Sequence, residues 1–361
     1  MRSRVLAGLL QRVEQTGRVA SGRFPMFADP QTGEWTWSED GGWSGGFWPG
    51  MLWLAAVATG ERRFADLASE SAQRLRSRAD AQTVLRGFLF WYGAGIASVL
   101  APARRAQAEL AITAARSLAA DVDPAAGVLP PGEEDAELYR WPRPGACIDG
   151  MPGTVPLLAF AAAATGEDRL RGIALTHARG LAAFCVRADG SVAQSATYDG
   201  QGRLTGQATI EGSSRDSTWA RGQAWAMLGL AQAAHLAGGE FTGTAARVAD
   251  WYLDHIPADT VSFWDFDDPA IPDAPRDTSA AAIAAASLLK LAALGDGRYR
   301  AAAERIVDAL AERHLARHGG LRDGCYDRHQ KLAMASELIW GDYFLLEALL
   351  ALDGMIEPGT L

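Results

Sequence analysis

Six stretches of the chain share one pattern, a Gly-rich or polar lead followed by an apolar helical run. Within each run apolar residues occupy nearly every position, which is typical of a helix that is buried on all sides. Repetition on this scale indicates an architecture in which one supersecondary unit recurs. The six stretches cover residues 42–60, 85–101, 148–166, 217–238, 276–295 and 338–352.

A second helical pattern, with charged residues on one face, follows each of the first five stretches. One example is RRFADLASESAQRLRSR, whose charges gather on one side of a helical period. Alternating buried and amphipathic helices close into a ring, and an N-terminal helix over residues 2–16 would complete the outer layer. The sequence therefore predicts an all-α fold, an (α/α)6 barrel, as a single domain over residues 1–361.

Extended structure is expected to be almost absent. Residues 190–199 alternate weakly between apolar and polar side chains, and this pattern predicts at most a small hairpin on the rim of the ring.

The loops that lead into the six buried helices should gather at one end of such a ring. A mouth lined by aromatic rings and carboxylates is typical of carbohydrate sites, because sugars stack their apolar C–H faces on indoles and offer hydroxyls to polar groups. Fold alone does not settle function. The loops carry Trp43, Arg86, Asp149, Trp219, Asp277 and Trp340.

The segment DSTWARGQAW, residues 216–225, allows two interpretations. Trp219 and Trp225 could belong to the core while Arg221 extends to water. Alternatively, the two indoles and the guanidinium line a pocket for a flat, anionic, hydroxyl-rich ligand.

Composition and charge argue against a nucleic-acid partner. The chain is 48% hydrophobic and 21% charged, with a net charge of −9. The basic clusters RSR, at 76–78, and ARR, at 103–105, are short and lie within helical patterns. A small molecule or an oligosaccharide is the expected substrate.

No metal or other cofactor is expected. Cys147, Cys185 and Cys325 are too widely spaced for a disulfide framework or a zinc site, so free thiols in a reducing compartment are predicted. His314 and His318 stand four residues apart and could form a metal pair, but without a third ligand a surface helix face is the better interpretation.

The N-terminal stretch MRSRVLAGLLQRVEQ is interpreted as an amphipathic first helix and not as a signal peptide, because Gln11 and Arg12 break its apolar run. No stretch approaches the ~18 uncharged apolar residues that a membrane span needs. A cytoplasmic protein without membrane contact is expected, as a monomer or a homodimer.

Several motifs resemble the unsaturated glucuronyl hydrolases, glycoside hydrolase family 88. They are GFWPGMLWLAAVATG, CIDGMPGTVPLLAF, RDSTWARGQAWAM, FWDFDDP with RDTSAAAIAAASLLKL, and IWGDYFLLEALL, in the family's order and over about residues 24–352. The resemblance implies removal of a 4,5-unsaturated uronic acid from the end of an oligosaccharide. In that chemistry an aspartic acid protonates the double bond and activates water, and the resulting hemiketal opens and releases the aglycone.

The resemblance also implies roles for individual residues. The family's catalytic aspartate matches Asp149, and its motif residues match Trp219, Arg221, Trp225 and Trp43. An aromatic, poorly hydrated pocket would keep such an aspartic acid protonated near neutral pH. Without that role, Asp149 would be a helix N-cap ahead of GMPG.

The chain departs from the family at positions that carry chemistry. The family's His-Asp pair ahead of Gly-Phe-Leu is Val84 and Leu85 here, and a second active-site carboxylate is therefore lost. Glu211 stands where the family has Gln, and Gln194 where it has His. Glu211 either restores a two-carboxylate site or faces solvent on a loop.

Three functions are compatible with this sequence. The favoured one is a family-88-like hydrolase with altered specificity, acting on a terminal uronic acid or related sugar. The second is a repurposed enzyme of this fold, a tailoring hydrolase, isomerase or cyclase with a less sugar-like ligand, and the third is a non-catalytic binding protein. The candidate catalytic residues are Asp149 and Glu211, and the candidate substrate-binding residues are Trp43, Arg86, Trp141, Gln194, Trp219, Arg221 and Trp225.

Overall fold

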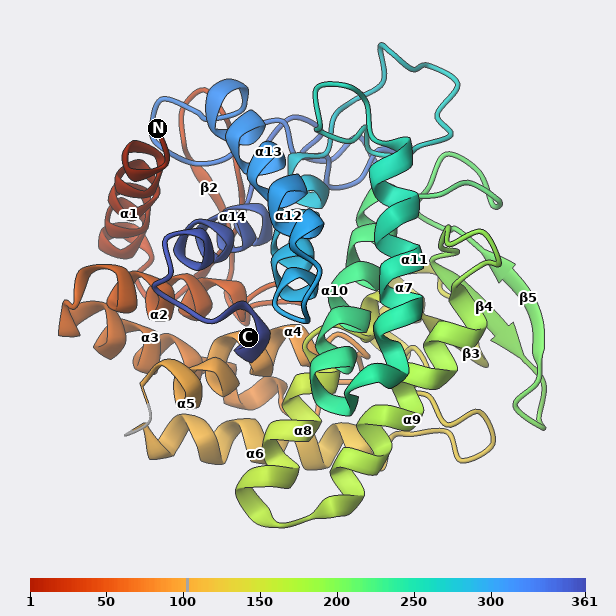
Figure 1. Ribbon diagram of the computed structural model, residues 1–361. Coiled ribbons are helices and arrows are strands. Elements are labelled where there is room, and N and C mark those ends of the chain that lie inside the picture. The colour runs from red at the N-terminus through yellow and green to blue at the C-terminus, as the bar shows by residue number, and fades with distance from the viewer. Residues whose placement is uncertain (102–103) are drawn as a thin grey trace.

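The computed structural model describes residues 1–101 and 104–361, and its helices form two layers (Figure 1). In the inner layer each helix packs against the next and α14 returns to α2, so the layer closes into a ring. The inner helices are α2 (Phe47–Thr59), the continuous run α4 (Arg86–Phe90), η2 (Trp91–Gly95) and α5 (Ile96–Leu100), α8 (Thr154–Thr165), α10 (Ala220–Ala237), α12 (Thr278–Ala292) and α14 (Ile339–Leu352).

The outer helices cover this ring and alternate with the inner ones along the chain. They are α1 (Arg2–Val19), α3 (Arg62–Arg74), α6 (Arg105–Ala120), α9 (Asp168–Cys185), α11 (Gly239–His255) and α13 (Gly297–Arg313). Helix α1 contacts α2, α13 and α14 and so completes the outer layer, as the sequence predicts. The predicted (α/α)6 barrel is confirmed. The amphipathic pattern ARRAQAELAITAARSLAA, residues 103–120, is the one that follows the second apolar stretch; it is observed as α6, while residue 103 lies outside the described residues.

Burial follows the two sequence patterns. Every residue of α14 is buried, as expected for a helix that is apolar all round. Helix α11 instead buries one stripe of residues, and its other face is exposed to solvent. That stripe is Phe241, Ala245, Val248, Ala249 and Tyr252, spaced at the helical period.

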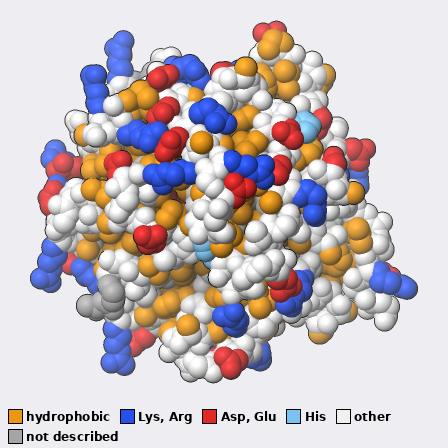
Figure 2. All heavy atoms as spheres, viewed as in Figure 1, with side chains coloured by type: hydrophobic (Ala, Val, Ile, Leu, Met, Phe, Trp, Pro, Cys, Tyr) orange, Lys and Arg blue, Asp and Glu red, His pale blue; other side chains and the backbone are white. Residues whose placement is uncertain are grey.

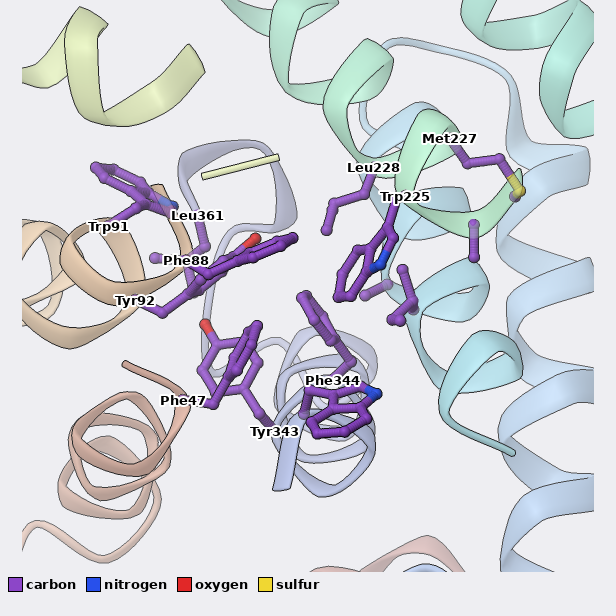
Figure 3. Close-up of a cluster of buried hydrophobic side chains, with 14 of the residues drawn as sticks. Phe47, Phe88, Trp91, Tyr92, Trp225, Met227, Leu228, Tyr343, Phe344 and Leu361 are labelled. Carbon is purple, nitrogen blue, oxygen red and sulfur yellow. The ribbon is translucent and has the colours of Figure 1, made fainter. Parts of the chain in front are cut away.

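Aromatic side chains fill the centre of the ring (Figure 3). The ring of Phe47 stacks on Tyr92 at 5.0 Å between centroids, and Phe88 lies 4.7 Å from Trp225. Phe344, from α14, contacts Trp225 at 5.7 Å. Packed aromatic rings therefore fill the axis of the barrel among the described residues.

A hairpin is observed where the sequence predicts one, because residues 195–198 form a strand that pairs with the next strand along the chain, but the limit to at most one small hairpin is wrong. Two antiparallel three-stranded sheets are present in the described residues, with strand orders β2-β1-β6 and β3-β4-β5. Each strand has only two to five residues, too few for alternation to stand out in the sequence. The strands are β1 (Phe24–Ala28), β2 (Trp35–Ser38), β3 (Gly145–Cys147), β4 (Ser195–Tyr198), β5 (Leu204–Ala208) and β6 (Glu337–Leu338).

Short helical segments join these elements. They are η1 (Leu75–Arg78), α7 (Glu133–Tyr139), η3 (Ile148–Gly150) and η4 (Pro358–Thr360). The interpretation of His314 and His318 as one surface helix face is wrong, because α13 ends before them and the two rings contact Asp323 and Glu337 respectively.

The surface mixes charges of both signs, with Lys and Arg side chains close to Asp and Glu side chains over the face in Figure 2. One ion pair joins Arg2 of α1 to Asp308 of α13 at 3.0 Å. No helix within the described residues is long and apolar enough to cross a membrane. All three cysteines are free and buried.

Candidate active site

A pocket opens at the end of the ring where the inner helices begin. The space between its walls, part of it open to solvent, is about 280 Å³. Asp149, Trp219, Arg221 and Trp225 line it together, as the sequence predicts. The full lining is Trp43, Leu85, Phe88, Trp141, Asp149, Glu211, Trp219, Arg221, Trp225 and Tyr326.

Asp149 sits in the single 3-10 turn η3, between the end of β3 and the start of α8. The interpretation of this residue as a helix N-cap is wrong, because Gly153 holds the N-cap position of α8. The Asp149 side chain is only 5% exposed. Its Oδ2 accepts a hydrogen bond of 3.2 Å from Gln194 Nε2, and its buried Oδ1 has no partner among the described residues.

Gln194 connects Asp149 to Glu211. Its Nε2 donates to Glu211 Oε2 as well as to Asp149 Oδ2. Its Oε1 accepts from the backbone N–H groups of Ile210 and Glu211 at 3.1 and 2.9 Å, which fixes the orientation of the amide. Gln194 therefore brings two carboxylates onto one nitrogen. Glu211 is partly buried in the pocket wall, which excludes its placement on a loop that faces only solvent.

The two carboxylates hold protons more tightly than ordinary acids do. Burial is the main cause that raises the pKa of Asp149 well above its usual value, and the nearby charge of Glu211 adds to it. Burial raises the pKa of Glu211 to about 7, against the opposing charge of Arg221. The pair therefore retains at least one proton near neutral pH, which is the state that a general acid requires.

Arg221 lies at the start of α10 and is buried beneath Trp219, whose ring centroid is 4.4 Å from the guanidinium carbon. Its Nη1 donates to Asp277 Oδ2 at 2.6 Å and to the carbonyl of Cys325 at 2.7 Å. Its Nη2 donates to the carbonyl of Tyr326 at 2.6 Å. Both hydrogens of Nη1 are used within the protein, so Arg221 cannot present its whole fork to a uronate. Its charge is largely balanced by Asp277, and what remains opposes the rise in the pKa values of Asp149 and Glu211.

Trp219 and Trp225 belong both to the hydrophobic core and to the wall of the pocket. Trp219 and Trp225 are 3% and 1% exposed, and both line the pocket. Trp225 also packs on Phe88 in the central aromatic cluster, so it forms the floor. Trp43 is less buried and donates from Nε1 to Tyr326 Oη at 2.9 Å.

Arg86 is not part of the pocket, and its assignment as a substrate-binding residue is wrong. Its guanidinium points toward the outer helix α6, where it donates to Ser117 Oγ at 2.8 Å and pairs with Asp121. The preceding residue, Leu85, lines the pocket instead. Tyr326 also lines the pocket but was not among the predicted site residues. The sequence did carry a signal for it, because Tyr326, like Trp43, is an aromatic residue in a loop ahead of an inner helix.

Relatives of known activity cover nearly the whole chain. No model of a known protein family matches it. The unsaturated glucuronyl hydrolase of Bacillus sp. (strain GL1) is 32% identical over 352 residues, which cover 92% of this chain and 91% of that protein. The unsaturated chondroitin disaccharide hydrolase of Streptococcus pyogenes serotype M1 is 30% identical over 329 residues, covering 85% of this chain and 80% of that protein.

A solved structure agrees with these sequence relatives. The crystal structure of the unsaturated glucuronyl hydrolase from Bacillus sp. GL1 matches with a TM-score of 0.90 and 30% identity, over 98% of this chain and 97% of that chain. Because the relatives are hydrolases, a repurposed isomerase or cyclase is not favoured, and neither is a non-catalytic binding protein. The chain belongs to the unsaturated glucuronyl hydrolases, glycoside hydrolase family 88, and is a glycosidase-type enzyme.

Proposed function

We propose that this enzyme removes a terminal unsaturated uronic acid from an oligosaccharide by adding water across the C4=C5 double bond, with Asp149 as the proton donor. One observation carries the proposal. Asp149 is a buried carboxylic acid with a raised pKa, and its Oδ1 is held in an aromatic pocket without a hydrogen-bond partner among the described residues.

The proposed reaction balances with Asp149 and one water. Protonated Asp149 gives its proton to C4, and positive charge develops at C5 next to the ring oxygen. The Asp149 carboxylate then takes a proton from water while the water oxygen bonds to C5, which restores the acid. The C5 hemiketal opens by breaking the bond from C5 to the ring oxygen, which gives a ketone at C5 and leaves a hemiacetal at C1. That hemiacetal collapses to an aldehyde and releases the aglycone as an alcohol.

Glu211 supplies the second carboxylate in this proposal. Leu85 stands where the family has a carboxylate, so the negative charge comes from the loop after β5 instead. Ionised Glu211 favours the protonated form of Asp149 and stabilises positive charge that develops at C5. Gln194 holds the carboxyl groups of Asp149 and Glu211 close together, because its amide nitrogen donates to both.

The charge balance of the pocket supports a specificity that differs from that of the relatives. Arg221 is paired with Asp277, so its charge is already largely balanced. A uronate that enters the pocket also meets Glu211, and the pocket tolerates both anions best when Asp149 carries its proton.

The cellular setting forms part of the same proposal. A cytoplasmic location accords with three buried free cysteines, and the enzyme would act there as a monomer or homodimer without a metal or other cofactor.

A substrate panel tests the proposal. Unsaturated uronyl disaccharides, saturated glucuronides and uncharged glycosides are incubated with the enzyme. Release of the leaving sugar is measured for all three classes, and loss of the ultraviolet absorbance of the conjugated double bond is followed for the unsaturated uronides. We expect turnover of the unsaturated uronides, and a loss of about 10²–10⁴-fold in kcat for Asp149→Asn. Asp254→Asn, an exposed aspartate on α11, is the matched control and should retain activity. Full activity of Asp149→Asn, or turnover confined to the other two classes, would overturn the proposal.

A further inference from the structure

A second, larger cavity adjoins the Asp149 pocket. Its volume is about 920 Å³, and it shares the side chains of Trp43 and Tyr326 with the smaller pocket. These two side chains are hydrogen-bonded to each other, so they form the boundary between the spaces. The reacting ring has to lie beside the unpartnered Oδ1 of Asp149. The rest of an oligosaccharide therefore has to pass Trp43 and Tyr326 into the larger space, which we call the outer cavity.

Acidic side chains dominate the outer cavity, which lies between the β1–β2 hairpin, the start of α7 and the loop before β6. Among the lining side chains that the structure describes, the charged ones are the carboxylates of Asp40, Glu134, Asp135 and Asp327 and the guanidinium of Arg78.

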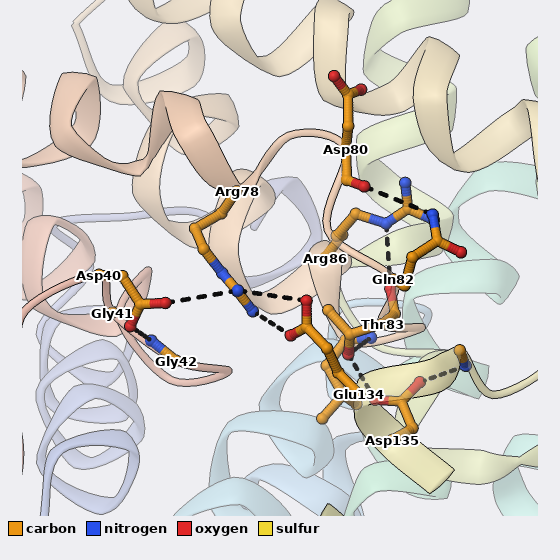
Figure 4. A network of polar contacts seen from close by, with 12 residues as sticks. Asp40, Gly41, Gly42, Arg78, Asp80, Gln82, Thr83, Arg86, Glu134 and Asp135 are labelled. Carbon is orange, nitrogen blue, oxygen red and sulfur yellow. Dashed lines mark hydrogen bonds and ion pairs between the residues drawn. The ribbon is translucent and has the colours of Figure 1, made fainter. Parts of the chain in front are cut away.

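The charge of Arg78 is already neutralised. Its Nη2 donates to Glu134 Oε2 at 2.6 Å, and its Nη1 lies 3.4 Å from Asp40 Oδ2 (Figure 4). One guanidinium thus faces two carboxylates and has little positive charge left for an anionic ligand.

The other two carboxylates of the outer cavity, Asp135 and Asp327, bring no further cation into it. Asp135 is buried and accepts hydrogen bonds from Thr83 Oγ1 at 2.6 Å and from the backbone nitrogens of Val84 and Gly132 at 2.8 and 2.7 Å. Burial raises its pKa. Asp327 Oδ1 accepts a hydrogen bond of 2.8 Å from the backbone nitrogen of Gln330. Even with Asp135 protonated, three carboxylates face one guanidinium.

We infer that the outer cavity receives the leaving part of the substrate and selects one that is neutral or positively charged, such as an amino sugar, over one that carries sulfate. The inference rests on the proposed function, since it assigns the leaving group of that reaction. Unbalanced carboxylates in a partly enclosed cavity repel a sulfate and attract an ammonium. We expect a discrimination of about tenfold or more in kcat/KM.

Three substrates that differ at one group test the inference. They are unsaturated uronyl disaccharides of one linkage whose second sugar bears an acetylated amine, a free amine or an N-sulfate. The sulfated compound should have a kcat/KM about tenfold or more below that of the acetylated one, and the free amine should match or exceed it. Added salt should narrow the gap, because screening weakens charge repulsion.

Two substitutions move the selectivity in opposite directions. Glu134→Gln frees the charge of Arg78 and should narrow the ratio of acetylated to sulfated turnover by about threefold to tenfold. Arg78→Gln should widen the same ratio. The matched control is Glu133→Gln, which removes the same charge from an exposed position one residue away on α7 and should leave the ratio unchanged.

The outcomes separate this inference from the proposed function. Equal or better turnover of the sulfated disaccharide by the wild type would overturn the inference and leave the proposed function intact. If none of the three compounds is cleaved, the proposed function fails. Calorimetric binding of the same compounds then decides the inference, and tighter or equal binding of the sulfated one would overturn it.

Discussion

Replacement of Glu211 by Gln should lower the rate of catalysis at high pH and leave the rate at low pH nearly unchanged. The substitution keeps the size of the side chain and an oxygen that can accept from Gln194, but it removes the charge. In the wild type, the charge of Glu211 contributes to the raised pKa of Asp149. Glu211 itself titrates at a pKa of about 7, so this support is present above neutral pH and fades below it.

The magnitude follows from the shared contact with Gln194. Two carboxylates that accept from one amide nitrogen lie on the order of 5 Å apart, where an effective dielectric constant near 20 gives an interaction of about 3 kcal/mol. That free energy corresponds to a factor of about 100 in the ratio of protonated to ionised Asp149 at a given pH. Well above pH 7, Glu211→Gln should therefore lose up to about 100-fold in kcat/KM.

The assay is kcat/KM for an unsaturated uronyl disaccharide from about pH 5 to about pH 9, in buffers of constant ionic strength. The alkaline limb of the variant should move to lower pH, while the two profiles converge below about pH 6. Glu312→Gln, which removes an exposed carboxylate from the outer helix α13, serves as the control and should follow the wild type. A uniform decrease at every pH, or no change, would refute the electrostatic link between Glu211 and Asp149.

Three further predictions concern stability. Arg12→Met breaks the buried 2.8 Å ion pair with Glu337 and should cost about 3–5 kcal/mol in the free energy of unfolding, measured by denaturant titration. Leu85→Asp, which restores the family's residue, places a carboxylate on an apolar wall and should lower Tm by several degrees in a thermal melt. Folded Glu211 binds a proton that the unfolded chain releases above about pH 4.5, so the wild type should lose stability as pH rises toward 7, by on the order of 2 kcal/mol. The Glu211→Gln variant should lose less stability over the same pH range. Parallel curves of Tm against pH for the two proteins would contradict this.

The barrel was predictable because its signal is local. Apolar runs and one-sided charge patterns recur with the helical period, and each observed inner or outer helix falls within a predicted stretch or begins beside one. Helix α1 is an example. Val5, Leu9 and Val13, which belong to its predicted amphipathic pattern, are buried on the side that faces the ring. Short strands lack such a signal. Strand β1 pairs with β6 across more than 300 residues of sequence, and no local pattern encodes that contact.

The site was predictable in position and less so in detail. Loops that precede inner helices gather at one end of a ring, which placed Asp149, Trp219 and Trp43 correctly. Side-chain direction changes by about 100° per residue at a helix start, so neighbouring residues point to different sides. Leu85 faces the pocket for this reason, while Arg86 faces the outer layer. Only the three-dimensional structure separates the two.

Leu85 and Glu211 both act on the protonation of Asp149, the proton donor of the proposed reaction. Leu85 and Phe88 line the pocket that contains Asp149, and burial is the main cause of its raised pKa. Glu211 reaches the same acid from the loop after β5 through Gln194 and adds a negative charge at a fixed place. Asp149 thus shares its pocket with an apolar wall and one titrating neighbour, and both favour its protonated form. The apolar side chain at position 85 therefore contributes to the burial that raises the pKa of Asp149, while the negative charge that raises it further comes from Glu211.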